Sequence, residues 1–397
     1  MTAILTPAAT TPGGGPAAHS RRLIAVLSVT QTVGYGVLSY AFPVLLTPIA
    51  HELGASTATV TGAFTAAIVA AAAASIPVGR WLDKQGGRAL LTFGSATAAA
   101  LVLAWSQVTT IWQLYAVFVL IGLASATMLY EAAFPVIVAA TRPERRDNAL
   151  LAVTIVAGFA SSIFFPLTGL LLERHGWRTT LVILAVLLAA ITIPAHLLAV
   201  PGRRQHQTRT AGAGSGVREA LRDKAFWLLA AAFVVHGAAI SAVGVLLVTY
   251  LLRAGHTATA AATLSGLLGI LSVTGRLTTT GLSKRFGMTA VTAAVFAAQA
   301  FGAAALPFLG GTIAGAGACI VAFGLGFGVA TIARPAILAA RYGTSRYATI
   351  AGIMTMPITL AKAGAPLAAA AVAPNTFMAA AAIACGTSAL LLLRISR

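Results

Sequence analysis

The chain has very few charged residues for its length. Only 9% of its 397 residues are Asp, Glu, Lys or Arg, and no more than 8 of these residues are acidic. Soluble globular domains carry roughly 25% charged residues, so this chain lacks the charge to cover a surface in contact with water. Because 58% of its residues are hydrophobic and its mean hydropathy is +0.91, we expect it to fold in a lipid bilayer.

Cysteine is also scarce. The chain has 2 cysteines, Cys319 and Cys385, and each lies in an apolar run. They provide neither a disulfide framework nor the ligand spacing of a metal site, so we interpret both as packing residues. The sequence also lacks paired carboxylates, a nucleophile with a neighbouring base and a phosphate-binding loop with Lys. These absences argue against a membrane enzyme or sensor, and we predict no enzymatic activity, no cofactor and no metal.

The net charge of +18 has an ordinary explanation in a membrane protein. A soluble protein with this charge would be a candidate for nucleic-acid binding, whereas short cytoplasmic loops of membrane proteins collect Lys and Arg. With the N-terminus inside, 20 of the 26 basic residues fall in cytoplasmic segments and 3 in outer loops. We therefore expect a multi-pass protein of the cytoplasmic cell membrane, with both termini cytoplasmic, lipids around it and no nucleic-acid partner.

Apolar runs of about 20 residues, the length needed to cross a bilayer, occur twelve times. The predicted spans are 23–50, 57–80, 89–107, 111–140, 149–172, 178–200, 225–251, 257–282, 288–309, 312–340, 348–372 and 376–393. The predicted fold class is therefore an all-α membrane protein with twelve transmembrane helices.

The spans divide into two groups of six. The polar, basic segment 201–224 is expected to be a cytoplasmic linker between an N-terminal six-helix bundle, 23–200, and a C-terminal one, 225–397. Residues 1–22, rich in Ala, Thr, Pro and Gly in their first part, are expected to form a disordered cytoplasmic tail.

The two halves resemble each other at an offset near 200 residues. Pro135 matches Pro335, and Pro166 matches Pro366. Parallel six-helix repeats, related by a pseudo-twofold axis along the membrane normal, are a transporter architecture with its substrate site between the halves near the midplane. The repeat therefore favours two pseudo-symmetric bundles and a transporter.

A charged hairpin of ten residues, 79–88, joins spans two and three. It resembles the loop signature of the major facilitator superfamily, Gly-x-x-x-Asp-(Arg/Lys)-x-Gly-x-(Arg/Lys), and the matching residues are Gly79, Asp83, Lys84, Gly86 and Arg88. The resemblance implies a gating role for the hairpin. Asp83 would lie against the N-terminus of span eleven, where the helix dipole favours an anion, and would latch the halves until the cavity opens inward.

Spans eight and eleven resemble those of the monocarboxylate transporters and the oxalate:formate antiporters. Span eight reads Thr-Gly-Arg276-Leu-Thr, and span eleven reads Ala-Lys362-Ala-Gly-Ala-Pro366. The resemblance implies that Arg276 and Lys362 bind the carboxylate of a substrate. Two positions depart from related patterns: Lys284 stands where the repeated signature usually has Asp, and Phe118 stands about where proton-coupled drug exporters have Arg. The first departs from this branch, and the second weakens the exporter alternative.

Four ionisable residues lie deep inside predicted spans, namely Glu131, Arg276, Arg334 and Lys362. Each such residue costs about 2.5–3.5 kcal/mol to insert and so needs a reason. Spans three, nine and twelve have no charged residue in their interiors, and the family arrangement makes these helices, with span six, the lipid-facing ones. The charges are therefore expected to line or flank a central cavity, although Arg334 is near enough to the inner edge to snorkel.

Within this group, Arg276 and Lys362 suit an anionic substrate because Arg offers a planar fork and Lys a point charge. Backbone carbonyls or Glu131 are the alternative partners of Arg276, and the alternative for Lys362 is that it snorkels. Glu131 is the candidate for proton coupling because desolvation favours its neutral form. The alternatives are a permanent ion pair with an in-membrane Arg and a protonated, hydrogen-bonded carboxyl. Tyr35 and His236 lie opposite each other in the repeat and are candidate substrate contacts, although a lone buried His is more often a packing residue.

These observations predict a secondary transporter. We expect a monomer that moves a small, monocarboxylate-like organic anion across the cytoplasmic membrane by alternating access, coupled to a proton. The alternative function is a proton-coupled exporter of drug-like or amphipathic small molecules.

Overall fold

The computed structural model describes residues 16–202, 216–256 and 258–396, and regular structure within these ranges is entirely helical. In chain order the helices are α1 (Pro16–Tyr35), the π-helix η1 (Gly36–Tyr40), α2 (Ala41–Glu52), α3 (Thr57–Gln85), α4 (Gly87–Ser106), α5 (Ile111–Met128), α6 (Tyr130–Ala140), α7 (Pro143–Gly158), α8 (Ala160–Ala199), α10 (Val217–Arg222), α11 (Lys224–Arg253), α12 (Ala258–Phe286), α13 (Met288–Leu309), α14 (Ile313–Gly324), α15 (Ala330–Tyr342), α16 (Tyr347–Ala370) and α17 (Pro374–Ser396).

These helices provide the twelve predicted spans. Nine segments of the described chain are long and apolar enough to cross a membrane. One of them, Pro143–Ala199, holds two spans, because the chain reverses at Gly176, whose φ of 72° suits only a residue without a side chain. Helix α12 provides another span, and α14 with α15 provides the last. The predicted all-α fold class is confirmed.

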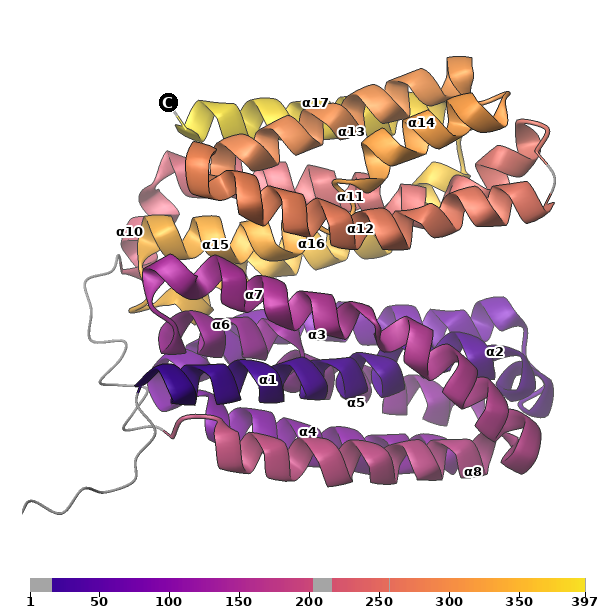
Figure 1. Cartoon of the computed structure of the whole chain (residues 1–397). Helices are drawn as coiled ribbons and strands as arrows, with labels where there is room; N and C mark the ends of the chain where they lie inside the picture. The colour runs from indigo at the N-terminus through magenta and orange to yellow at the C-terminus, as the bar shows by residue number, and fades with distance from the viewer. Residues whose placement is uncertain (1–15, 203–215, 257, 397) are drawn as a thin grey trace, which may run out of the picture.

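The spans form two bundles, α1–α8 and α10–α17, which lie one above the other in Figure 1. The start of α1, the end of α8, α10 and the C-terminus all lie at one end of the molecule, called here the terminal end. The opposite end is called the distal end.

Two expected boundaries differ from the structure. Helix α1 begins at Pro16, so the last part of the expected tail is helical, whereas residues 1–15 lie outside the described ranges. The last part of the expected linker is also ordered. There Glu219 accepts a hydrogen bond from the Gly216 N–H at the start of α10, and Asp223 caps α11 by accepting from the Ala225 N–H at 2.9 Å. Residues 203–215 lie outside the described ranges.

Large apolar side chains are exposed on the helices that contain the charge-free spans. Phe93 on α4, Phe301 on α13 and Ile383 on α17 are each about 70% exposed. Helices α4 and α8 pack together in one bundle, and α13 and α17 pack together in the other. Because these helices contain the third, sixth, ninth and twelfth spans, the charge-free spans of the sequence are on the outside.

Several spans are interrupted along their length, among them the first, the fourth and the tenth. The first changes to a π-helix at Gly36, the fourth breaks at Leu129, whose φ and ψ are −86° and −159°, and the tenth passes through turns at 325–329. Interrupted helices at membrane depth occur where the backbone is buried in protein or lines a cavity. Tyr35 and Glu131 lie directly beside two of these breaks.

Candidate functional site

Asp83 joins the two halves at the terminal end. Its carboxylate accepts hydrogen bonds from the backbone N–H groups of Ala348 at 3.1 Å and Thr349 at 2.8 Å. Both donors belong to the first turn of α16, where N–H groups have no partner within the helix. The carboxylate therefore satisfies two orphan donors and also benefits from the helix dipole. This is the contact that the hairpin signature implied; its role in gating stays a proposal.

Glycines bring the backbones of α3 and α16 into direct contact beside Asp83. A Cβ atom added to Gly79 would lie 2.3 Å from the Ala348 carbonyl oxygen, and one added to Gly352 would lie 2.3 Å from the Ser75 carbonyl oxygen. The Ser75 hydroxyl also donates to the Gly352 carbonyl at 3.0 Å. The two halves are therefore tightly closed along this crossing.

The remaining signature residues act within their own half. Gly86 has a φ of 76° and allows the sharp turn between α3 and α4. The Arg88 guanidinium donates from Nε to the Val200 carbonyl at 2.7 Å, at the end of α8. Lys84 is exposed, and within the described ranges it has no hydrogen-bond or salt-bridge partner. Arg88 thus ties the hairpin to its own bundle.

The halves meet through one set of helices. Helices α3, α6 and α7 pack against α12, α15 and α16. In Figure 1 the ribbons of the two halves lie close together toward the terminal end and farther apart toward the distal end. Together with the Asp83 contact, this arrangement describes a molecule that is closed at its terminal end.

Arg276 on α12 also bridges the halves. Its Nε donates to the Gly328 carbonyl in the interruption of the tenth span, and its Nη1 donates to the Thr154 carbonyl on α7, each at 3.1 Å. A Cβ atom on Gly328 would lie 2.4 Å from this Nε, so the approach requires glycine. Of the two alternatives for Arg276, backbone pairing is present. Three of its five N–H donors are left for another ligand.

Glu131 and Arg334 face one small cavity from opposite halves. The cavity measures about 20 Å³ and is lined by residues of α3, α6, α15 and α16, including Thr355 and Tyr347. A cavity needs roughly 10–15 Å³ to hold one water molecule. Among the described residues, Glu131 has no salt bridge within 4.0 Å, so the permanent ion pair that we considered is not formed in this state.

Lys362 lies two turns farther along α16 than Thr355. Its side chain is exposed, and its Cε lies 3.2 Å from the position of a Cβ on Gly237 of α11. Its charge interacts favourably with Glu131 and unfavourably with Arg334. Among the described residues, its ammonium group has no hydrogen-bond or salt-bridge partner. The Lys362 side chain therefore packs beside Gly237 of α11 and interacts with charges from both halves.

Tyrosines complete the first half of the site. The rings of Tyr35 and Tyr130 lie 4.7 Å apart between centroids, and Tyr130 stacks on Phe134. Tyr35 interacts electrostatically with Glu131, and Tyr130 interacts with the Arg276 charge. The structure thus brings Tyr35, Glu131 and Arg276 together around Tyr130.

His236 does not point into this space. Its ring is buried, stacks on Phe296 of α13 with 3.6 Å between centroids, and hydrogen-bonds through Nε2 to the Gln299 side chain at 2.9 Å. Gln299 in turn donates to the Phe323 carbonyl. These contacts place His236 inside the C-terminal bundle, in agreement with the alternative that it is a packing residue.

The sequence analysis gave Arg334 and Tyr130 no substrate or coupling role, and the structure adds both to the site. Arg334 was expected either to line or flank the central cavity or to snorkel to the inner membrane surface, and in the structure it lines the inter-half cavity. The repeat contained a usable signal, because Arg334 directly precedes Pro335, which matches Pro135 one turn after Glu131. Both charges therefore belong to equivalent interrupted spans.

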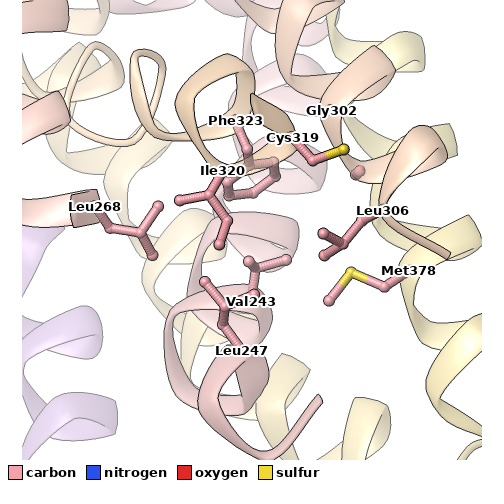
Figure 2. A pocket seen from close by; sticks show the side chains of 10 residues that line it. Val243, Leu247, Leu268, Gly302, Leu306, Cys319, Ile320, Phe323 and Met378 are labelled. Atoms are coloured by element: carbon pink, nitrogen blue, oxygen red, sulfur yellow. The ribbon is translucent and has the colours of Figure 1, made fainter. Parts of the chain in front are cut away.

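A second void lies within the C-terminal bundle (Figure 2). It measures about 10 Å³, and side chains of α11–α14 and α17 surround it, among them Leu268, Cys319, Phe323 and Met378. Its lining is apolar and it has no charged group. This void is a packing defect between helices, and it is too small for a substrate.

Comparison with known structures supports the fold described above. A variant of the Escherichia coli fucose:proton symporter FucP is similar with a TM-score of 0.73 and 17% identity, covering 97% of this chain and 100% of that one. The human organic anion transporter MFSD10 (TETRAN) is similar with a TM-score of 0.68 and 15% identity, covering 95% and 98%. A bacterial homologue of the iron transporter ferroportin in an outward-facing state has a TM-score of 0.74 and 15% identity, covering 95% and 99%.

A search of curated protein sequences found no match. The family model described as Major Facilitator Superfamily matches residues 27–366, which is most of the chain. This match agrees with the twelve spans, the two bundles and the hairpin at 79–88. It also confirms that the chain is a transporter and not an enzyme. The chain belongs to the Major Facilitator Superfamily.

Proposed function

We propose that this transporter moves a small, monocarboxylate-like organic anion by alternating access and couples its movement to a proton. The observation that carries the proposal is the position of Lys362, an exposed and unpartnered ammonium group between the halves, within the described part of the chain. With Lys362 protonated, the interior group comprises three cations, Arg276, Arg334 and Lys362, and one acid, Glu131. An anion that enters this space lowers the electrostatic cost of the uncompensated charge.

Arg276 and Lys362 have different roles in this proposal. Lys362 attracts the carboxylate as a point charge, whereas Arg276 offers its remaining N–H donors beside Tyr130. Tyr35 contributes a hydroxyl group from the first span. His236 lies behind Gly237, against which Lys362 packs, and supports that wall without contacting the substrate. The combination suits a compact anion with a carboxylate and a hydrogen-bonding group.

Glu131 is the proposed proton carrier. It is half-buried, it has no hydrogen-bond partner among the described residues, and its charge acts on Lys362. A carboxylate in that position competes with an anionic substrate for the same cation. Protonation of Glu131 removes the competition, so proton and anion bind together, which is the requirement of symport.

The signature hairpin is the proposed gate. Asp83 and Gly79 hold α3 against α16, and Lys84, Gly86 and Arg88 shape and anchor the hairpin. The distribution of Lys and Arg supports a cytoplasmic location for the terminal end in the cell membrane. On this orientation the structure is closed to the cytoplasm, and the substrate enters from the outside.

The names of similar structures are compatible with this proposal. One is a fucose:proton symporter, and another is an organic anion transporter. Because these structures are only 15–17% identical to this chain, their substrates are not assigned to it. The proposal rests on the charged residues in the interior. The second candidate, a proton-coupled exporter of amphipathic compounds, is favoured less because the interior group has an excess of positive charge.

Counterflow in proteoliposomes tests the proposed substrate class. The purified protein is reconstituted, and labelled substrate exchange is measured for a panel of carboxylates, neutral sugars and organic cations at pH 5.5 and pH 7.5. We expect saturable exchange of small carboxylates, absent from protein-free vesicles. Saturable exchange of only neutral or cationic compounds would contradict the proposal.

A further inference from the structure

The cavity between Glu131 and Arg334 suggests a role for Arg334 that the substrate site does not include. The cavity lies at the interface of the halves, with Ser75 of α3 and Glu131 of α6 on one side. Arg334 of α15 and Tyr347 and Thr355 of α16 lie on the other side. It is therefore bounded by the same helices that close the terminal end.

Arg334 is not available to the lipid surface. It is half-buried, it lines this cavity beside Pro335, and its charge interacts with buried Tyr347 and with Lys362. Among the described residues it forms no salt bridge within 4.0 Å. An uncompensated guanidinium at an interface destabilises that interface unless an anion approaches it.

Glu131 is the acid that can approach. The groups that face it from the surrounding helices are Tyr35 of α1, Arg334 of α15, and Lys362 and Tyr347 of α16. Tyr130, its neighbour on the same helix, interacts electrostatically with both Glu131 and Arg276, and Arg276 is hydrogen-bonded to the carbonyls of Gly328 and Thr154. On α7, Arg146 donates to the carbonyls of Val138 and Thr141. Arg334 and Lys362 are thus the two cations between which Glu131 is placed.

We propose that Arg334 is the residue through which the charge of Glu131 controls closure of the terminal end. Ionised Glu131 pairs with Arg334 across the cavity, directly or through one water molecule, and holds α6 against α15. Protonated Glu131 loses this attraction, and Arg334 is left uncompensated in the closed interface. The proton therefore releases the terminal end, while Lys362, on the distal side of Glu131, holds the anion. Arg334 is in this sense a positioning residue.

This inference rests on the proposed function only in taking Glu131 as the group that is protonated. It is tested on the protein without substrate, so its failure is distinguishable from failure of the anion proposal. The native thiols Cys319 and Cys385 are buried, so spin labels can be attached to exposed positions at the terminal end of opposite halves, as Arg145→Cys and Lys284→Cys. The distance distribution between the labels is measured by pulsed electron resonance at pH 8 and pH 5.

In the otherwise native protein, we expect acidification to raise the open-to-closed ratio at the terminal end by on the order of tenfold, a usual size for coupling between sites. Glu131→Gln and Arg334→Gln should each shift the terminal end toward the open state at both pH values. The open-to-closed ratio of the double variant should equal that of either single variant. Arg334→Lys keeps the charge and should keep the pH response. Lys362→Gln should also keep it while losing carboxylate counterflow.

Two results would overturn the inference. One is a native pH response in Arg334→Gln or in Glu131→Gln. The other is additive effects of the two substitutions in the double variant. The control is Arg253→Gln, which removes an exposed basic residue at the C-terminal end of α11, away from the terminal end of the molecule. Its pH response should match that of the native protein. If Arg334→Gln does not fold, Arg334→Lys and Glu131→Gln still decide, because loss of the response in the first or its persistence in the second contradicts the mechanism.

Discussion

Asp83 on α3 accepts a 2.8 Å hydrogen bond from the backbone N–H of Thr349 on α16, and these residues belong to opposite halves of the molecule. A second bond from the neighbouring N–H makes the carboxylate a two-point clamp on a helix N-terminus. Opening of the terminal end must break both bonds. The stability of the closed state should therefore depend on this single side chain.

Asp83→Asn should weaken the closed terminal end. Asn keeps the shape of Asp but loses the negative charge and one acceptor oxygen, and hydrogen bonds to charged groups are worth about 1.5–3 kcal/mol. We expect the closed-to-open ratio to fall roughly tenfold or more, and transport to slow, as measured by inter-label distances and by counterflow. Glu173→Gln neutralises an exposed acid at the distal end and is the control. Unchanged conformational populations and turnover in Asp83→Asn would remove the gating role.

Gly79→Ala should separate α3 from α16. The new Cβ would lie 2.3 Å from the Ala348 carbonyl oxygen and 2.9 Å from the Thr349 Cα, so backbone must move. We expect loss of the closed state and of most transport, read from cysteine accessibility and counterflow. Gly281→Ala is the matched control, because that helical glycine has no neighbouring atom within 4 Å. It should be neutral or stabilising by up to about 1 kcal/mol. Equal behaviour of the two variants would show that the crossing is not a tight contact.

Glu131→Gln should uncouple transport from the proton. Gln resembles the protonated acid but cannot release a proton, so exchange of substrate on both sides can continue while uphill uptake cannot. We expect counterflow to continue at a reduced rate, because this variant also favours the open terminal end, and no accumulation when a proton gradient is imposed. Retention of gradient-driven accumulation by this variant would exclude Glu131 as the coupling group.

The distal end should lose stability in acid through Glu52. Hydrogen bonds from the Trp177 indole and the Arg178 guanidinium, together with the Arg178 charge, lower the pKa of the Glu52 carboxyl below its ordinary value of 4.5. The unfolded state then binds more protons, so the contribution is complete above about pH 4.5 and is lost as pH falls through the lower, folded pKa. Both side chains are partly exposed, so we expect a modest effect of roughly 1 kcal/mol or less.

Thermal unfolding in detergent measures this effect. The native protein should melt above Glu52→Gln at pH 7, and the difference should shrink below pH 4. Glu173→Gln, which removes an acid without a described partner, should show no such convergence. A difference between native and Glu52→Gln that stays constant from pH 7 to pH 3 would contradict the assignment.

Much of this architecture could be predicted from the sequence because membrane spans impose a strong length and polarity requirement. The predicted span 288–309 coincides with α13, and the hairpin signature correctly brought Asp83 to the start of α16. The rotation of each helix about its axis was harder to predict. Helices that face both lipid and protein are apolar on most sides, so periodicity does not say where one polar side chain points.

His236 and Arg334 illustrate this limit. His236 was assigned to the cavity from its position in the repeat, but its ring packs inside the bundle against Phe296. The depth of Arg334 left open whether its side chain lines the cavity or snorkels to the membrane surface, and it lines the small cavity together with Glu131. For Arg276 the sequence left open whether its partners are backbone carbonyls or Glu131. In this structure Arg276 donates to backbone carbonyls in both halves. Each outcome depends on packing between distant helices.

Carboxylate counterflow by the Lys362→Gln variant tests the central claim most directly. Gln retains most of the side-chain length and its packing against Gly237 but has no charge, so the protein should fold while the anion loses its main attraction. We predict a rise of at least tenfold in the half-saturating carboxylate concentration, consistent with loss of a charge-assisted contact of roughly 1.5–3 kcal/mol. Native affinity and rate for the carboxylate in Lys362→Gln would contradict the account.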